Sequence, residues 1–438
     1  MHVPLATLIC ATAPFVMTVN MLPQRRSQFD MSAVSSHWRQ TALSSPELWI
    51  SMDITVWRNK VGRAIKIMRA FLARSGRMPL SIGLDMCNMA MKFPQPVAEE
   101  VLHILSGCSP RLRELHLIDP PEGWINVFTP SYTILRSLSV VRRSRDIISD
   151  ELDSLDVLPC SRLALSWVSG QVKLRWTAIT VLRLAFLSAD LSLKILRSCV
   201  NLTEFRSKAH TYHEGQLAHP PPAAPFILPY IRIFEWPLLS IASAVDSALL
   251  RFIRMPVLDT LVWHEAVDSR HYEVFGPWDD PRVTFFDHLP ATLSALHLDN
   301  HGAPHGLSYP VLRFLRRELR IETFSIRSTL TIAIENLCRV LTREMLEGAE
   351  TVLPNLRRMY ICLDLRPGRG PGPDPSSLLR MLESRLSVTG PGTTILPSIH
   401  LELKGKSRHL AWILELEERA REIIQHGLEF HYDIDHFF

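Results

Sequence analysis

The stretch LRELHL (residues 112–117) places apolar side chains at its first, fourth and sixth positions. The same L-x-x-L-x-L spacing, with other apolar residues allowed, recurs down the rest of the chain. Successive starts lie roughly 19 to 40 residues apart, where the shorter gaps are typical of leucine-rich repeats and the longer ones indicate insertions. The further instances are LRSLSV (135–140), CSRLAL (160–165), ITVLRL (179–184), LTEFRS (202–207), IRIFEW (231–236), LDTLVW (258–263), LSALHL (293–298), IETFSI (321–326), LRRMYI (356–361) and LPSIHL (396–401).

Helical stretches are expected between many of these motifs. The apolar residues of the first two stretches are Val101, Ile104 and Leu105, and Leu193, Leu196 and Val200. Those of the third are Ile241, Ala244, Val245, Ala248, Leu249 and Phe252, and those of the fourth are Leu337, Leu341 and Met345, with the helix ending at Gly348. A unit of one short strand and one helix buries its apolar face only against its neighbours. We therefore predict an α/β fold, a leucine-rich-repeat solenoid of short parallel strands alternating with helices, over residues 58–408.

An ordinary α/β fold also alternates strands and helices, so it is the alternative. Three features weigh against it: the strands are very short, the motif keeps one spacing, and no glycine-rich turn follows a strand. At the solenoid's start, apolar residues from Val61 to Leu72 predict an amphipathic helix that stops at Ser75-Gly76, and MPLSIGLDM (78–86) predicts a strand.

Proline and glycine mark the predicted breaks, with loops at 219–226 and 366–375. The stretch 409–427 reads as an amphipathic helix that Gly427 ends, and residues 409–438 are expected to form a capping helix and tail, because terminal repeats require a cap. Residues 1–28 are left unassigned.

Composition narrows the function classes. A formal net charge of +4 over 438 residues does not favour a nucleic-acid partner, and short basic clusters such as RRSR (142–145) read as solvated edges. The apolar start is interrupted by Pro14, so a membrane span is not expected. The seven scattered cysteines lack any CxxC pair and predict reduced, buried thiols in a cytoplasmic or nuclear protein.

Catalytic and metal-binding patterns are weak. His297, His301 and His305 stand four apart, but the surrounding glycines and proline predict a solvated loop rather than a metal site. The glycines of GRGPGPDP lack the flanking strand and helix of a phosphate cradle, and the carboxylates of WDDP (278–281) read as a solvated turn. We predict no enzymatic activity, no cofactor and no metal; the chain reads as an interaction protein.

The segment SSHWRQTALSSPELW (35–49) has a different character. Asp30 is a candidate cap for a helix that carries Met31, Val34, Trp38 and Ala42 at helical spacing. Ser45 is then expected to cap a second short helix with Pro46 at its first position, where a missing N–H costs nothing.

The longer segment VSSHWRQTALSSPELWISMDI (34–54) resembles the second half of the F-box found in large families of mushroom-forming fungi. The similarity extends through FLARSGRMPLSIGLDM (71–86) and the repeats, so it covers about residues 29–438, with partial F-box-like helices over residues 29–57. Ser35 stands where the family usually has cysteine. The matching residues are Val34, Trp38, Arg39, Ala42, Leu43, Ser44, Pro46, Leu48, Trp49 and Ser51.

This resemblance implies a substrate-recognition subunit of an SCF (cullin–RING) E3 ubiquitin ligase. The F-box would dock the Skp-type adaptor and through it the cullin, and the repeats would hold a protein substrate that the sequence does not identify. The implied adaptor-binding residues are Val34, Trp38, Leu43, Leu48 and Trp49. For Val34, Trp38, Leu48 and Trp49 a second role stays open, packing the F-box remnant onto the first repeat. We favour packing for Leu48 and Trp49, and adaptor contact for Val34 and Trp38.

The family's first F-box helix, with its Leu-Pro, has no recognisable counterpart, since the Leu-Pro of LPQRR (22–26) lies too close to Met31. We expect either a truncated or mis-started gene model or a degenerate member with weakened adaptor binding. The alternative function is a leucine-rich-repeat scaffold that no longer binds the adaptor. A secreted leucine-rich binder is a third possibility, which the unpaired cysteines oppose.

Overall fold

A computed structural model describes the chain in segments, and the chain forms two compact units, Met1–Arg175 and Trp176–Phe438. The sequence analysis placed no boundary at this position. The described residues are 34–57, 60–86, 95–121, 124, 132–142, 152–155, 159–167, 172–208, 224–236, 249–265, 281–300, 307–317, 320–328, 331–342, 352–364, 375–386, 398–406, 410–421, 423 and 428–435.

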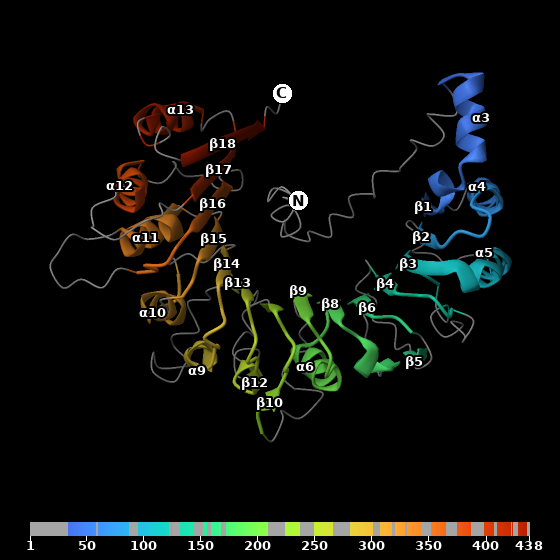
Figure 1. Cartoon of the computed structure of the whole chain (residues 1–438), viewed down its shortest axis with the longest axis horizontal. Helices are drawn as coiled ribbons and strands as arrows, with labels where there is room; N and C mark the ends of the chain where they lie inside the picture. The colour runs from blue at the N-terminus through green and yellow to red at the C-terminus, as the bar shows by residue number, and fades with distance from the viewer. Residues whose placement is uncertain are drawn as a thin grey trace. The chain divides into compact units, whose positions relative to one another are not determined.

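Among its described residues, the first unit starts with helix α3 (Ser36–Ser44) and the short 3-10 helix η1 (Pro46–Trp49), after which strands and helices alternate as far as β3 (Leu112–Ile118) (Figure 1). Its main sheet has the order β1-β2-β3-β4-β6, and the neighbouring strands are parallel. The other elements are β1 (Ser51–Thr55), α4 (Val61–Arg74), β2 (Leu80–Asp85), α5 (Gln95–Cys108), η2 (Ser109–Arg111), β3 (Leu112–Ile118), β4 (Ser137–Val141), β5 (Leu152–Leu155), β6 (Arg162–Ser166) and β7 (Val172–Leu174).

The second unit repeats this alternation. Its main sheet has the order β8-β9-β11-β13-β14-β15-β16-β17-β18, again with parallel neighbours. Its strands are β8 (Val181–Ala185), β9 (Glu204–Lys208), β10 (Phe226–Ile227), β11 (Ile233–Trp236), β12 (Ile253–Arg254), β13 (Thr260–Glu265), β14 (Ala295–Asn300), β15 (Thr323–Ser328), β16 (Arg358–Asp364), β17 (Ser398–Lys406) and β18 (Leu428–Asp435). Its helices are η4 (Trp176–Ala178), α6 (Ala189–Ser198), α9 (Pro281–Asp287), α10 (Tyr309–Arg317), α11 (Thr331–Leu341), α12 (Pro375–Leu386) and α13 (Leu410–Arg419).

Each of the eleven L-x-x-L-x-L motifs supplies one strand of a main sheet, so the predicted alternation of short parallel strands with helices is confirmed. The fourth and sixth motif positions point into the core, because side chains alternate along a strand. Leu296 and Leu298 of β14 illustrate this, as both are buried while His297 between them is only half-buried.

A repeated backbone contact explains why the motif has two residues between its first apolar positions. In the second unit the amides of both intervening residues donate to one carbonyl of the preceding repeat. Glu322 and Thr323 donate to the Ser294 oxygen at 2.9 and 3.0 Å, and Arg357 and Arg358 donate to the Glu322 oxygen at 2.8 and 3.0 Å. The same geometry in successive repeats fixes the register between strands, because buried amides must find partners.

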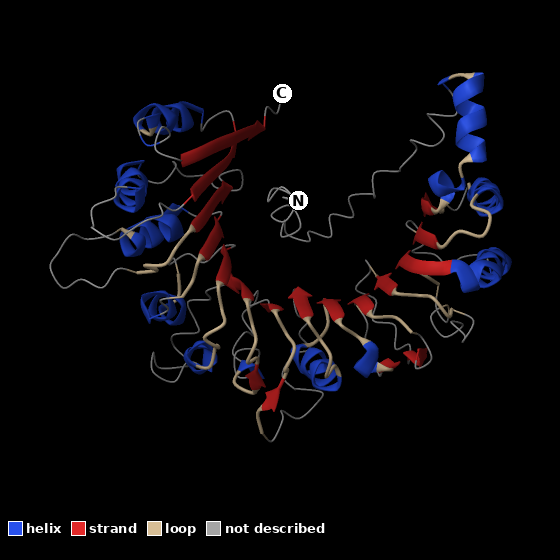
Figure 2. Ribbon diagram, in the orientation of Figure 1, coloured by secondary structure: helices blue, strands red, loops and turns tan. Residues whose placement is uncertain are grey.

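Helices α9 to α13 lie on one side of the second unit's strand layer (Figure 2). The core between them contains stacked aromatic rings, among which Trp263 lies 5.5 Å from Phe285 and 4.8 Å from Phe286, centroid to centroid. The opposite side of the strands is not covered by any described helix (Figure 2). We call it the open face; it carries the fifth position of each motif.

The structure differs from the sequence analysis at both ends of the repeats. Residues 51–55, expected among the F-box-like helices, form the strand β1, which pairs in parallel with β2. The side chains of Met52 and Ile54 alternate along β1 and are buried. The tail after Gly427 forms β18, a further parallel strand beside β17.

Two smaller differences concern helix ends. Val200, expected inside a helix, lies beyond the end of α6 and is exposed. The single helix predicted from Asp30 is interrupted, because Ser35 is extended between the helical Val34 and α3, which starts at Ser36 with Ser35 as its cap. Asp30 and Met31, residues 1–28, most of the two predicted loops, residues 241–248, Met345 and Gly348 lie outside the described residues.

Gly76 ends α4 as predicted, with a φ of 56°, the left-handed region that favours glycine. We expect Gly76→Ala to lower the free energy of unfolding by about 1 kcal/mol, because alanine is strained at this φ. Gly62, in the first turn of α4 with open space around its Cα, is the control: Gly62→Ala should raise stability by up to about 1 kcal/mol. Urea unfolding of both variants measures the difference, and a shift of the same sign in both would contradict it.

Candidate functional site

The first candidate surface is α3 with the two residues before it, Val34 and Ser35. The side-chain oxygen of Ser35 accepts the N–H of Trp38 at 3.2 Å and caps the helix. Ala42 is the one residue of α3 that is buried, whereas Val34, Trp38 and Leu43 are 70%, 50% and 43% exposed. We treat these exposed apolar side chains as candidate contact residues.

Leu43 also lines a shallow hollow on this helix, together with Ser36, Arg39, Gln40 and Ser44. The hollow combines one apolar side chain with polar groups and a guanidinium at its border. Such a mixture suits a protein partner, since interfaces have an apolar centre and a polar rim.

Trp49, from the same sequence segment, is fully buried. Its indole N–H donates to the carbonyl oxygen of Ala42 at 2.7 Å, and its ring meets Phe71 of α4 edge-on at 5.1 Å. The guanidinium of Arg74 covers the ring at 4.4 Å. In this structure Trp49 therefore packs α3 against α4 and offers no surface to a partner, and Leu48 beside it is half-buried.

Ser45 does not cap η1 as expected. Its hydroxyl instead donates to the carbonyl oxygen of Thr41 at 2.8 Å, and η1 has no side-chain cap. Pro46 stands at the first position of η1, as predicted, and turns the chain so that Trp49 reaches the core.

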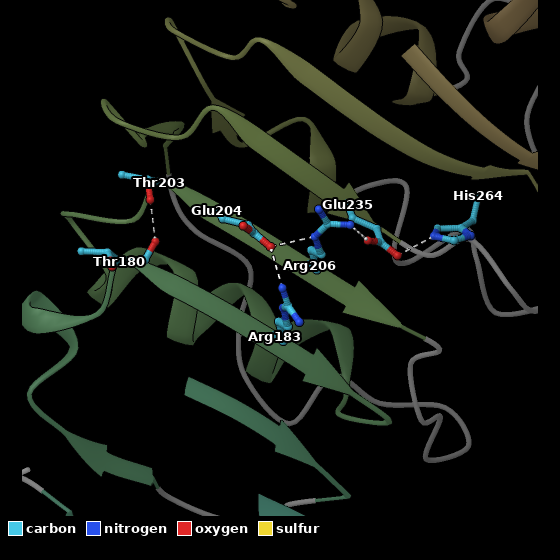
Figure 3. Close-up of polar contacts among 7 residues, drawn as sticks. All are labelled: Thr180, Arg183, Thr203, Glu204, Arg206, Glu235 and His264. Atoms are coloured by element: carbon cyan, nitrogen blue, oxygen red, sulfur yellow. Dashed lines mark hydrogen bonds and ion pairs between the residues drawn. The ribbon is translucent and has the colours of Figure 1, made fainter. Parts of the chain in front are cut away.

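The second candidate surface lies on the open face of the second unit. Six ionisable side chains of alternating charge cross five strands there (Figure 3 draws five of them). Arg183 and Arg206 bind Glu204 at 3.2 and 2.8 Å, and Arg206 continues to Glu235 at 3.4 Å. His264 then bonds Glu235 at 2.9 Å and Asp299 at 3.4 Å. We call Arg183, Glu204, Arg206, Glu235, His264 and Asp299 the ionic chain.

The middle of the ionic chain is buried, and this shifts its pKa values. Burial alone would lower the pKa of His264, but hydrogen bonds and attraction from Asp299 and Glu235 raise it to about 9. Burial would raise the pKa of Glu235, yet His264, Lys208 and Arg206 hold it below its usual value. Glu235 and His264 therefore form a charged pair at neutral pH.

In two neighbouring basic groups, Lys208 and His297, burial lowers the pKa. Burial lowers the pKa of Lys208 to about 8, although Glu235 and Asp299 act against it. Burial and the positive charge of Arg206 lower the pKa of His297 to about 4, so this imidazole is neutral. The open face thus combines fixed charges with a neutral ring that bonds the Ser325 hydroxyl at 2.5 Å.

The ionic chain was not predicted from the sequence. A signal was available, because Arg183, Arg206 and Glu235 all occupy the fifth motif position, and the register places these positions side by side. Of the histidines weighed as metal ligands, His297 lies on β14 in the ionic chain's neighbourhood. His301, His305 and most of WDDP lie outside the described residues.

The described cysteines are free thiols. Cys108, Cys160, Cys199 and Cys338 are buried and Cys362 is half-buried, in keeping with the expected buried thiols. Burial raises the pKa of each to about 11 or 12, which keeps the thiols protonated.

Of the helices that the structure describes, none combines the length and the apolar character that crossing a membrane requires. No protein-family model and no curated protein matches this chain.

Proposed function

We propose that this chain is an F-box-type substrate-recognition subunit of an SCF (cullin–RING) E3 ubiquitin ligase. In this proposal the α3 surface docks a Skp-type adaptor, and leucine-rich repeats present the open face to a protein substrate. The chain itself is non-enzymatic and works in the cytoplasm, the nucleus or both.

The exposure of Val34, Trp38 and Leu43 carries the proposal. A short helix that buries only Ala42 gains little from tertiary packing, so its apolar side chains contribute most when a partner covers them. Trp49 supports this arrangement from inside, since its bond to the Ala42 carbonyl anchors the helix to α4. Of the implied adaptor-binding residues, Val34, Trp38 and Leu43 are thus proposed as direct contacts and Trp49 as a positioning residue.

The repeats support the second half of the proposal. Each described repeat sets one short strand beside the next, and the fifth motif positions form a row across the open face of the second unit. This row mixes acidic, basic, aromatic and hydroxyl side chains, which gives the varied polar contacts that a protein segment requires. A uniformly basic row would have favoured nucleic acid instead.

The test is binding of the full chain to an immobilised, purified fungal Skp-type adaptor. We expect Trp38→Ala to weaken binding at least about tenfold, since tryptophans at the centre of an interface contribute about 2 kcal/mol or more. Trp57→Ala is the matched control: Trp57 is 40% exposed but follows β1 rather than lying on α3, so its loss should leave affinity within about twofold.

Both variants must show wild-type circular dichroism and melting before their affinities are compared. Equal binding by wild type and Trp38→Ala would exclude α3 as the docking surface. No binding by the folded wild-type chain would instead support the alternative, a repeat scaffold without an adaptor link.

A further inference from the structure

The open face carries a second group of ionisable side chains, on β17 and β18. His400 of β17 stands directly opposite Glu429 of β18, and His431 lies two residues further along β18 on the same face. His400 is half-buried, while Glu429 and His431 are exposed. The two strands therefore bring two imidazoles and one carboxylate together from positions 29 and 31 residues apart, counted from His400.

The distances are close to those of a metal site. The Nδ1 atom of His400 lies 3.2 Å from Oε2 of Glu429, and the two imidazole rings stack with centroids 4.8 Å apart. One ligand atom from each of the three residues lies within 4.8 Å of the others. Ligands around a tetrahedral ion with bonds of about 2.0–2.1 Å are about 3.3 Å apart, so small side-chain rotations would bring all three into range.

The donor chemistry selects the type of ion. Two imidazole nitrogens and one carboxylate oxygen suit zinc and its neighbours among the divalent transition metals, whereas calcium and magnesium prefer oxygen alone. Cys362 on β16 lies opposite Glu402 in the strand register, two residues beyond His400, and it does not belong to the group of three ligand atoms within 4.8 Å. Glu402 itself binds Lys404 at 3.1 Å and lies next to His431 in the register.

We propose that His400, Glu429 and His431 bind a divalent transition metal of the zinc type, with water completing its coordination. The ion would join β18 to β17 across the open face. Because metal bound by two strands stabilises only the state in which they are paired, binding should protect β18 from opening. This proposal is independent of adaptor docking.

Zinc chloride titrated into the full chain by calorimetry tests the site. We expect His400→Gln and His431→Gln each to weaken one zinc-binding event at least about tenfold, since even mutating residues that only orient metal ligands costs about 10–100-fold. His103→Gln is the matched control, because His103 is exposed on α5 in the first unit. The zinc affinity of the His103→Gln variant should equal that of the wild type.

Two further readouts separate this site from binding by cysteines or other histidines. Cobalt bound here should lack the intense charge-transfer absorption that thiolate ligands give, and zinc should slow hydrogen exchange of β18 amides in the wild type but not in His431→Gln. The proposal is overturned if the wild type binds no zinc, if both glutamine variants bind it as the wild type does, or if all bound cobalt shows thiolate absorption.

Discussion

Trp49→Ala is expected to lower the free energy of unfolding of the first unit by about 3–5 kcal/mol, the usual cost of truncating a buried tryptophan. The ring has no exposed surface, so its removal leaves a cavity between α3, η1 and α4. The change also deletes the hydrogen bond to Ala42, the edge-on contact with Phe71 and the guanidinium contact of Arg74. Urea unfolding followed by circular dichroism measures the loss.

Trp38→Ala is the control within the same segment. Trp38 is half exposed, so its truncation should change the free energy of unfolding by no more than about 0.5 kcal/mol. The two variants therefore distinguish stability from docking. Trp49→Ala is expected to lower the stability of the fold, and Trp38→Ala is expected to weaken binding to the partner. A loss below about 1 kcal/mol for Trp49→Ala would contradict the anchoring role assigned to it.

The repeats were predictable because one rule governs each of them. The first, fourth and sixth motif positions must be apolar to fill the core, and the two residues between the first pair must donate both amides to the preceding repeat. The alternation of Met52 and Ile54 predicts the strand β1, whereas the resemblance of this segment to an F-box predicts a helix there. The strand β18 has Gln425 instead of an apolar residue at the first motif position, so the motif spacing does not predict it.

The sites were less predictable than the fold. Motif alignment places Arg206 beside Glu235, and His400 beside Tyr360, without any structure. It does not give burial, however: Glu235 is 4% exposed while Glu429, at the equivalent position of β18, is exposed. Burial depends on how neighbouring side chains pack around each group, so the pKa shifts of the ionic chain could not be predicted from motif spacing.

Glu235→Gln is expected to cost about 3 kcal/mol of stability near pH 6, within the range for removing one partner of a buried ion pair. The variant keeps the shape of the side chain and loses its charge, which leaves the His264 imidazolium with Asp299 alone at 3.4 Å. Glu322→Gln is the control, because Glu322 and Arg357 form an exposed pair at 3.8 Å that contributes less than about 1 kcal/mol.

The cost should also depend on pH, because His264 has its pKa raised to about 9 in the folded protein, whereas the unfolded value is 6.5. A raised pKa adds stability that is complete below pH 6.5 and disappears as pH rises through 9. The pKa of Lys208, lowered to about 8, makes the stability of the wild type rise with pH above that value, which opposes the loss from His264. The difference between wild type and Glu235→Gln, measured by urea unfolding from pH 6 to 10, should therefore shrink towards pH 10. A difference that stays constant over this range would show that His264 is not held in its charged form.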